Sequence, residues 1–384
     1  MSPGTPEPAT EGHPASAPYR ADELASRVLE DYLSLRAREN VIIEIRRGML
    51  PYARAFARAT RRAGGSPLIL YEDEDAWWDS VEAGDAAALG RVGEHEWAAL
   101  EKTNVYVFFW GPVEDYDRFV QLQQAQFQAA FAFNTKWYEL AKSTGVRGLR
   151  VGVALATPSI ARRLGISTEE YLHRLVDSAL VQPSDLRSRA DLIVNRLRNA
   201  RELRITHPNG TDLRLRVRPG PPRVDVGIPR PASDREPLSQ LMDVPAGQVE
   251  VELEPDFGDG LILSDRRSVS RRGSLSGQRW EFREGRLISA TAESGGEAAD
   301  ALLKKGDPVA TRMGCLGFGL NPLARDLPAQ EAIGEGAVTL GIGGTTLDFR
   351  VDWASEADIR VTQATVRVDG QTLIESGEFQ QGPL

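Results

Sequence analysis

The second half of the chain holds few side chains that could act on a bound molecule, and they are of mixed types. Cys315 is the single cysteine, and no histidine follows His207. Arg350 and Asp352 stand two positions apart, so on a strand both side chains point to the same side of a sheet. Because an arginine fork binds carboxylates, this pair predicts either a carboxylate-binding group or a structural ion pair.

Cys315 has two interpretations. A nucleophilic thiolate needs a base or a positive charge beside it, and the histidines that could supply one, His173 and His207, belong to an earlier part of the chain. A free cysteine otherwise behaves as a small buried hydrophobe. We favour the buried hydrophobe.

Three glutamates, Glu250, Glu252 and Glu254, alternate along one predicted strand and therefore share a face. Such a face predicts either a site for Mg²⁺ or Ca²⁺, which prefer oxygen ligands, or the solvated side of a half-buried strand. We favour the solvated side, because one strand cannot enclose an ion without ligands from elsewhere.

Several motifs in this half occur in the order found in one family of metal-dependent peptidases. They are Pro245-Ala246-Gly247-Gln248-Val249, the segments 314–322, 336–341 and 368–370, and Arg350-Val351-Asp352. From about residue 20 to its C-terminus, the chain resembles the thermophilic-type metallo-aminopeptidases, the aminopeptidase T or leucyl aminopeptidase group. The resemblance implies a second domain that carries a two-metal site. It also implies a homodimer or a paralogue heterodimer.

At the positions where the resemblance implies metal ligands, this chain carries other residues. Gln248 and Cys315 stand where glutamates are expected, and Ala337 stands where a histidine is usual. Arg350 replaces the histidine of a His-x-Asp motif, so only Asp352 remains. A two-metal hydrolytic site needs carboxylates and imidazoles, whereas arginine brings a permanent positive charge. We therefore predict that the metal pair is absent and that no other cofactor replaces it.

The expected function is that of a metal-free aminopeptidase-like protein that binds a peptide or amino-acid-like ligand. It would serve as a non-catalytic partner or as a repurposed peptide-tailoring component of a biosynthetic pathway. The candidate ligand-binding residues are Arg350, Asp352, Gln248, Cys315, Asn321 and Glu331.

Two alternatives remain open. One is an active metallo-aminopeptidase with an atypical ligand set drawn from Asp352, Asp348, Glu331 and the glutamates near Glu250. The other is an iron-dependent ring-cleaving dioxygenase, since dihydroxypyridine dioxygenases resemble the same family. That chemistry needs two histidines and a carboxylate, so the missing histidines count against it.

Three further segments have both a functional and a plain interpretation. Gly341–Thr346 is rich in glycine but lacks the lysine and the helix of a phosphate-binding loop, which favours a flexible loop beside the site. The basic, serine-rich stretch Asp265–Ser274 predicts an exposed hairpin tip rather than a docking or phosphorylation site. Trp77-Trp78 predicts core packing, or a cover for a cleft or dimer surface.

Composition bounds the class of protein. With 384 residues, 41% hydrophobic and 26% charged, the chain can form two domains with sizeable cores. A net charge of -9 argues against nucleic-acid binding, and no apolar run approaches the roughly 20 residues that span a bilayer. Residues 1–18 predict a disordered tail rather than a secretory signal. A single cysteine is compatible with a reducing cytoplasm.

The pattern of elements changes near residue 202. Before it, strand and helix patterns alternate, which predicts a three-layer α/β domain over 19–201 with a mainly parallel sheet. After it, strands dominate, which predicts a strand-rich α+β domain over 202–384 of the aminopeptidase T type. The expected strands are 41–45, 68–71, 105–109, 150–155, 203–206, 212–217, 249–253, 260–263, 279–283, 286–291, 338–340 and 359–368; the expected helices are 21–39, 51–63, 115–143, 167–180 and 184–200.

Overall fold

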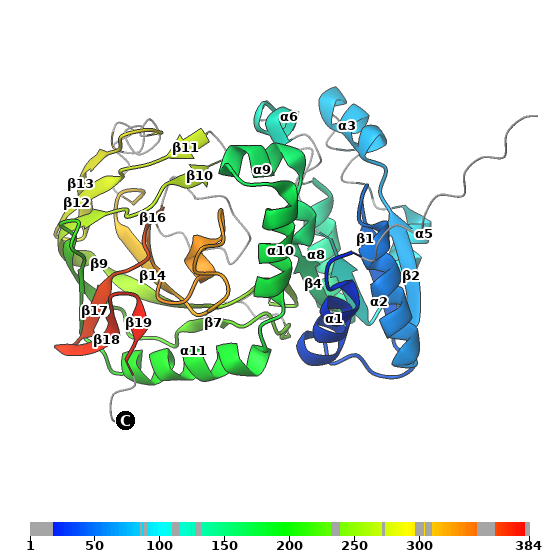
Figure 1. Cartoon of the computed structure of the whole chain (residues 1–384), viewed down its shortest axis with the longest axis horizontal. Coiled ribbons are helices and arrows are strands. Elements are labelled where there is room, and N and C mark those ends of the chain that lie inside the picture. The colour runs from blue at the N-terminus through cyan, green and yellow to red at the C-terminus, as the bar shows by residue number, and fades with distance from the viewer. Residues whose placement is uncertain are drawn as a thin grey trace, which may run out of the picture.

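The computed structural model describes residues 18–84, 87, 91, 93–109, 116–123, 125–126, 132–231, 239–270, 273–295, 303, 309–343 and 358–380. Figure 1 shows two parts side by side, an α/β part built on a parallel sheet and a larger part built on antiparallel strands. This arrangement confirms the predicted fold class.

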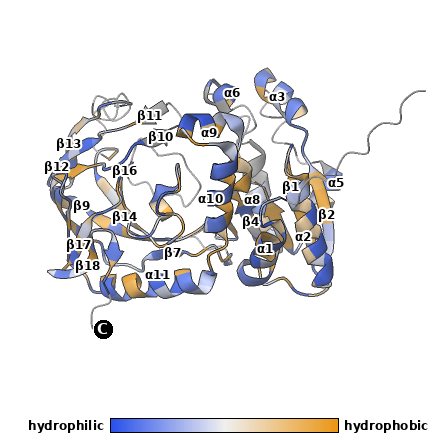
Figure 2. Cartoon of the chain, in the orientation of Figure 1, coloured by the Kyte–Doolittle hydropathy of each residue, from blue (hydrophilic) through white to orange (hydrophobic). Residues whose placement is uncertain are grey.

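The first sheet has five parallel strands in the order β2-β1-β3-β4-β8. Strands β1 and β3 carry apolar residues on both faces, because helices cover the sheet on both sides. The strands are β1 (Asn40–Ile45), β2 (Ser66–Tyr71), β3 (Val105–Phe108), β4 (Arg147–Val151) and β8 (Leu241–Val244). Figure 2 shows hydrophobic residues, in orange, along strand β2 of this sheet.

Two groups of helices cover this sheet. The helices α1 (Ala21–Ser26), α2 (Leu50–Arg62) and α10 (Thr168–Ala179) share a core with one face, together with the π-helix η1 (Arg27–Tyr32). Packed on the other face are α5 (Glu94–Glu101) and α8 (Ala132–Thr144). The remaining elements of this part are α3 (Glu74–Ala83), α6 (Tyr116–Val120), the 3₁₀ helix η2 (Gly152–Leu155) and α9 (Pro158–Leu164).

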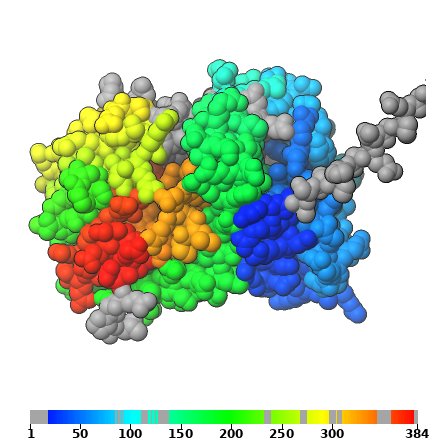
Figure 3. Space-filling model, in the orientation of Figure 1, coloured from blue at the N-terminus to red at the C-terminus, as the bar shows by residue number. Residues whose placement is uncertain are grey.

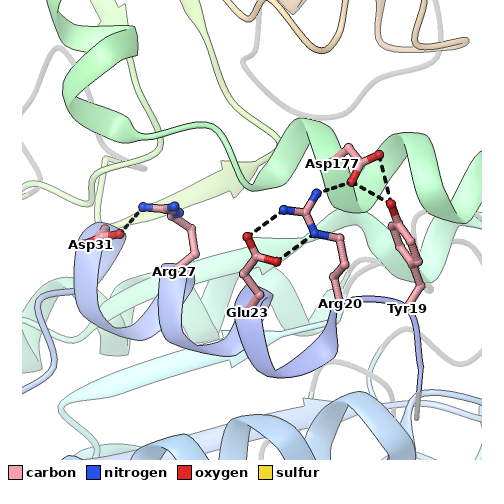
Figure 4. Close-up of polar contacts among 6 residues, drawn as sticks. All are labelled: Tyr19, Arg20, Glu23, Arg27, Asp31 and Asp177. Carbon is pink, nitrogen blue, oxygen red and sulfur yellow. Dashed lines mark hydrogen bonds and ion pairs between the residues drawn. The ribbon is translucent and has the colours of Figure 1, made fainter. Parts of the chain in front are cut away.

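A polar network ties the start of the described chain to α10 (Figure 4). The Arg20 guanidinium donates to Asp177 Oδ1 over 2.6 Å and to Glu23 Oε1 over 2.6 Å. The Tyr19 hydroxyl donates to the same Asp177 oxygen over 3.2 Å, and its ring stacks on His173 with centroids 3.7 Å apart. The hydrogen bonds from Arg20 also hold the pKa of Glu23 below its usual range. Helix α1 is thereby fixed against the helix that stands between the two parts.

The second sheet has twelve strands, and its described pairings are antiparallel. The long strand β9 (Gln248–Leu263) lies at its centre and pairs with β6, β7, β12 and β14. The other strands are β5 (Glu202–Thr206), β6 (Asp212–Val217), β7 (Arg223–Asp225), β12 (Arg279–Arg283), β13 (Arg286–Thr291), β14 (Met313–Gly319), β15 (Val338–Ile342), β16 (Asp358–Val361), β17 (Thr365–Val368), β18 (Gln371–Glu375) and β19 (Glu378–Phe379). Helix α11 (Pro183–Leu197) packs into the core of this sheet.

Most expected elements are found within a few residues of their predicted bounds. The predicted helix start at Ser167 is confirmed, since its hydroxyl accepts from the Glu170 N–H over 3.0 Å as an N-cap. The hairpin predicted at Asn209-Gly210 joins β5 to β6. The basic stretch forms the hairpin β10 (Ser268–Ser270) and β11 (Gly273–Leu275), with 271–272 outside the described residues.

Four local predictions are corrected. The strands expected at 249–253 and 260–263 are one strand, because β9 continues through Pro255. The strand expected at 359–368 is two, β16 and β17. Residues 121–123 are not helical, so α6 and α8 replace one helix over 115–143. The strand expected at 150–155 ends at Val151, where η2 begins.

A sharp turn joins the two sheets. The chain leaves β8 at Val244, passes Pro245-Ala246-Gly247, and enters β9 at Gln248, with a cis peptide before Pro245. Gly247 has φ +133°, and a Cβ there would lie 3.1 Å from the Asn321 backbone, so only glycine fits. The first sheet thus takes its fifth strand from beyond residue 202, and α11 from before it packs with the second core. The division at residue 202 stays a prediction.

Candidate functional site

One face of the second sheet is apolar and the other is polar, yet both are buried where β7, β9, β14, β15 and β16 run side by side. Val249, Phe318, Leu340 and Ile359 point into the core. Side chains on the opposite face alternate with them. This polar face comprises Arg223, Asp225, Gln248, Glu250, Thr339, Asp358 and Arg360. Buried polar groups of this density need partners, so this face is the candidate site.

The strand register brings five positions into one row across the sheet. Arg223 pairs with Glu250, Glu250 with Gly317, Gly317 with Thr339, and Thr339 with Arg360. Gly317 has no side chain, so no side chain of the row stands between Glu250 and Thr339. Each end of the row carries an arginine.

At one end of the row, Arg223 Nη1 lies 3.2 Å from Glu250 Oε1. The Glu250 side chain is only 1% exposed, so the expectation of a solvated glutamate face is wrong for this residue. It holds for Glu252, which is exposed and lies 3.4 Å from Arg218. Glu254 lies 3.4 Å from Arg216. Each glutamate therefore faces an arginine rather than a shared cation.

At the other end, Arg360 lies between two carboxylates. Its Nη2 is 3.4 Å from Asp358 Oδ2 and its Nη1 is 3.5 Å from Glu331 Oε2. Glu331 begins the short 3₁₀ helix η3 (Glu331–Ile333), and its Oε1 accepts from the Ala329 N–H over 3.1 Å. Burial raises the pKa of Glu331, although Arg360 opposes this shift.

The segment that carries η3 is held over the sheet by α10. The Arg174 guanidinium donates to the Asp326 carbonyl over 2.8 Å, and the Ser178 hydroxyl donates to the Leu323 carbonyl over 2.8 Å. A Cβ on Gly319 would lie 1.9 Å from the Gly334 carbonyl oxygen, so this segment closes directly onto β14. Figure 3 shows the segment, in orange, between the green helices and the red C-terminal strands.

Several buried polar atoms of this face have no hydrogen-bond partner within the described part of the chain. They are Gln248 Nε2, Thr339 Oγ1, and the Nε and Nη1 of Arg360. Gln248 is 3% exposed and Thr339 is fully buried. An unsatisfied buried donor costs roughly 1–3 kcal/mol, so these groups lower stability unless something binds them.

The structure brings together only some of the predicted site residues. Gln248 and Glu331 contribute to the polar region. Cys315 is 2% exposed on β14, opposite Glu252 and Gly341, which agrees with a small buried residue. Arg350, Asp352 and Asp348 lie outside the described residues, as do 344–346 of the predicted loop.

Asn321 serves the scaffold. Its Nδ2 donates to the carbonyls of Ser178 and Ala246, each over 2.9 Å, and its Oδ1 accepts from the Leu323 N–H over 3.0 Å. Its amide is thus bonded to the backbone, and a role of Asn321 in ligand binding stays a prediction.

Arg223, Thr339 and Arg360 are not among the residues predicted from the sequence. Alternation of polar and apolar residues along β9, β15 and β16 is a usable sign of a polar face, but strand pairing decides which of these residues stand side by side.

The described residues do not fit the metal pair that the resemblance implies. Gln248 offers a neutral amide, Glu250 is ion-paired to Arg223, and Arg360 brings a fixed positive charge to the same face. Among the described residues, no group of three or more His, Cys, Asp or Glu side chains is placed to hold a metal ion. We therefore propose no metal-dependent chemistry for this face.

A small cavity of about 140 Å³ opens beside Glu252. It is lined by Arg218 and the loop Pro219–Pro222, with Val251 behind. The cavity borders β9 at Glu252, which stands on the same face of this strand as Gln248 and Glu250. The polar face therefore reaches the surface at this edge.

A buried charged cluster lies where the two sheets join. Arg150 of β4 and Asp243 of β8 are paired in the register, with side chains 10% and 4% exposed and an N–O distance of 2.5 Å. Asp225 of β7 neighbours Gln248 in the second sheet and accepts from the Gly227 N–H over 2.8 Å. Burial raises the pKa of Asp225 to about 7, because desolvation and Asp243 outweigh the Gly227 hydrogen bond, Arg230 and Arg150. The polar face thus continues into the junction.

Known proteins with a similar fold exist, but their sequences have little similarity to this chain. No model of a known protein family matches the chain, and no curated protein matches it. AmpT from Thermus thermophilus has a similar structure, with a TM-score of 0.63 and 17% identity over 94% of this chain and 98% of that chain. A 2,5-dihydroxypyridine dioxygenase from Pseudomonas putida KT2440 is also similar, with a TM-score of 0.56 and 14% identity over 96% and 99%. The chain has an aminopeptidase T-like fold.

Among the described residues, no helix is both long enough and apolar enough to cross a membrane.

Proposed function

We propose that this protein is a metal-free relative of the aminopeptidases that binds a peptide or amino-acid-like ligand on the polar face of its second sheet. The observation that carries this proposal is the set of buried polar atoms on Gln248, Thr339 and Arg360 that have no partner among the described residues, on a face where arginines stand beside carboxylates. Unsatisfied donors cost stability, and retaining several on one face is explained if a ligand satisfies them.

The strand geometry suggests the size of the ligand. Gln248 lies on β9 and Thr339 on β15, the two strands that flank β14. These two strands are therefore two strand spacings, about 10 Å, apart. A molecule of roughly dipeptide size can reach both. This protein would hold such a ligand as a non-catalytic partner, or position it as a peptide-tailoring component of a biosynthetic pathway. Orientation alone can accelerate reactions within a bound molecule.

The assembly and location belong to the same proposal. We infer a homodimer or a pair with a paralogue, acting in the cytoplasm, on the resemblance to the aminopeptidases. Native mass measurement tests the assembly, and a particle of single-chain mass at micromolar concentration would contradict it.

Metal content separates this proposal from catalysis by metal. We expect purified protein to retain less than one equivalent of zinc, cobalt or iron per chain after dialysis, because Gln248 and the arginines supply no ligand set. Plasma emission spectrometry measures this. Two equivalents of zinc or cobalt, with leucine-amide hydrolysis lost in Asp352→Ala, would establish the metallo-aminopeptidase instead. One equivalent of iron per chain would favour a ring-cleaving dioxygenase. The structural similarity to the 2,5-dihydroxypyridine dioxygenase makes this the remaining candidate.

Ligand binding is tested by thermal shift with dipeptides and amino-acid derivatives. We expect wild-type protein to be stabilised by at least one of them, and Gln248→Met and Arg350→Ala to reduce the shift. Without ligand, Gln248→Met should be no less stable than wild type, because it removes a buried donor that has no partner among the described residues. Gln363→Met, at an exposed glutamine in a turn, is the matched control. If no compound shifts the melting temperature, ligand binding is wrong.

A further inference from the structure

The charges and donors at the Arg360 end of the polar face differ from those at the Arg223 end. At the Arg223 end, an arginine nitrogen and a carboxylate oxygen lie 3.2 Å apart in hydrogen-bonding geometry. At the Arg360 end, Nη2 donates to Asp358 Oδ2 over 3.4 Å and Glu331 Oε2 lies 3.5 Å from Nη1, but Nε and Nη1 have no hydrogen-bond acceptor among the described residues. The charge of Arg360 therefore faces two carboxylates, while two of its nitrogens have no hydrogen-bond partner in the described part of the chain.

Thr339 completes this arrangement. It is the register partner of Arg360 on the neighbouring strand, so both side chains stand on the same face at adjacent positions. Its hydroxyl is fully buried and has no partner in the described part of the chain. A guanidinium edge beside a hydroxyl donor is a combination that matches the two oxygens of a carboxylate.

We propose that Arg360 and Thr339 form a subsite for a ligand carboxylate, with Asp358 and Glu331 positioning the guanidinium. This inference rests on the proposed function and specifies which end of the ligand binds here. The carboxylate would accept from Arg360 Nε and from Thr339 Oγ1.

The surroundings permit such a ligand. Gly317, the other register neighbour of Thr339, contributes no side chain between Thr339 and Glu250. The side chains of Arg360 and Glu331 remain 12% and 10% exposed, so the cluster reaches the surface. Burial raises the pKa of Glu331, although Arg360 opposes this shift.

Two ligands that differ in one end test the subsite by calorimetry. N-acetyl-leucine has a carboxylate and no amine, and leucine amide has an amine and no carboxylate. We expect wild-type protein to bind N-acetyl-leucine at least about tenfold more tightly than leucine amide, because the fork and the hydroxyl find no carboxylate in the amide.

The variant Thr339→Val keeps the shape of the side chain and removes the hydroxyl. It should weaken N-acetyl-leucine binding about ten- to hundredfold while raising the melting temperature of the free protein, because it removes an unsatisfied group. Thr60→Val is the matched control, since Thr60 on α2 is also fully buried with a hydroxyl that lacks a partner among the described residues. It should raise stability and leave binding unchanged.

A second variant, Arg360→Lys, keeps the charge and removes the planar fork, so it should weaken N-acetyl-leucine binding as well. Equal affinity for the two ligands, or unchanged binding in Thr339→Val, would overturn the subsite. If leucine amide or a dipeptide amide binds and N-acetyl-leucine does not, the subsite is wrong but the proposed function stands. If nothing binds, both are wrong.

Discussion

Replacing Arg150 by methionine is expected to lower the free energy of unfolding by about 3–5 kcal/mol, the typical cost of breaking a buried ion pair. The side chains of Arg150 and Asp243 are 10% and 4% exposed, and Asp225 lies in the same cluster. Without the guanidinium, two buried carboxylates remain close together at the junction of the sheets. Urea unfolding at pH 8, followed by circular dichroism, measures the loss.

Two controls make this prediction specific. Arg58→Met removes a similar contact, 2.8 Å from Asp22, between side chains that are 55% and 59% exposed, so its cost should be below about 1 kcal/mol. The double variant Arg150→Met with Asp243→Leu should recover most of the loss, because two apolar side chains leave no uncompensated charge. If Arg150→Met costs no more than Arg58→Met, the pair does not stabilise the junction.

The second large effect concerns pH. Asp225→Asn is expected to make the protein more stable than wild type at pH 8 and to give no such gain at pH 4. The folded pKa of Asp225, about 7, lies above its ordinary value of 3.8, so the folded state binds the proton more tightly than the unfolded chain. Wild-type stability therefore falls as pH rises from about 4 to 7, by an amount on the order of 2–4 kcal/mol.

Asparagine removes this loss while keeping an oxygen that can accept from the Gly227 N–H. Unfolding free energies at pH 4, 6 and 8 give the profile, and Asp191→Asn, at a side chain 60% exposed, should follow the wild type. Part of the slope will remain in Asp225→Asn, because burial raises the pKa of Glu44 to about 8 in the first sheet. A variant profile parallel to the wild-type profile would show that Asp225 does not titrate in this range.

The junction cluster and the polar face are continuous through neighbouring residues. Asp225 pairs in register with Gln248, and Gln248 begins the strand that carries Glu250. The turn Pro245-Ala246-Gly247 passes directly from Asp243 of the first sheet to this strand. A ligand that contacts Gln248 would therefore bind next to the charges that hold the two sheets together.

Much of the first sheet was predictable because its information is local. Strands such as β1 and β3 consist of short apolar runs with residues buried on both faces, and the helices between them have recognisable ends, such as the cap at Ser167. The predicted bounds of a strand were wrong where a residue type typical of a strand end occurs inside the strand. Pro255 resembles a strand end, yet β9 continues through it.

The sequence alone established that no histidine follows His207 and that an amide stands at Gln248. It also established the α/β and strand-rich halves, since both follow from the periodicity of neighbouring residues. The partners of Glu250 and Arg360, the burial of Thr339 and the return of β8 to the first sheet required the tertiary structure. Each depends on strand pairing between residues far apart in the chain, such as Gly317 with Glu250, and no local pattern encodes that register.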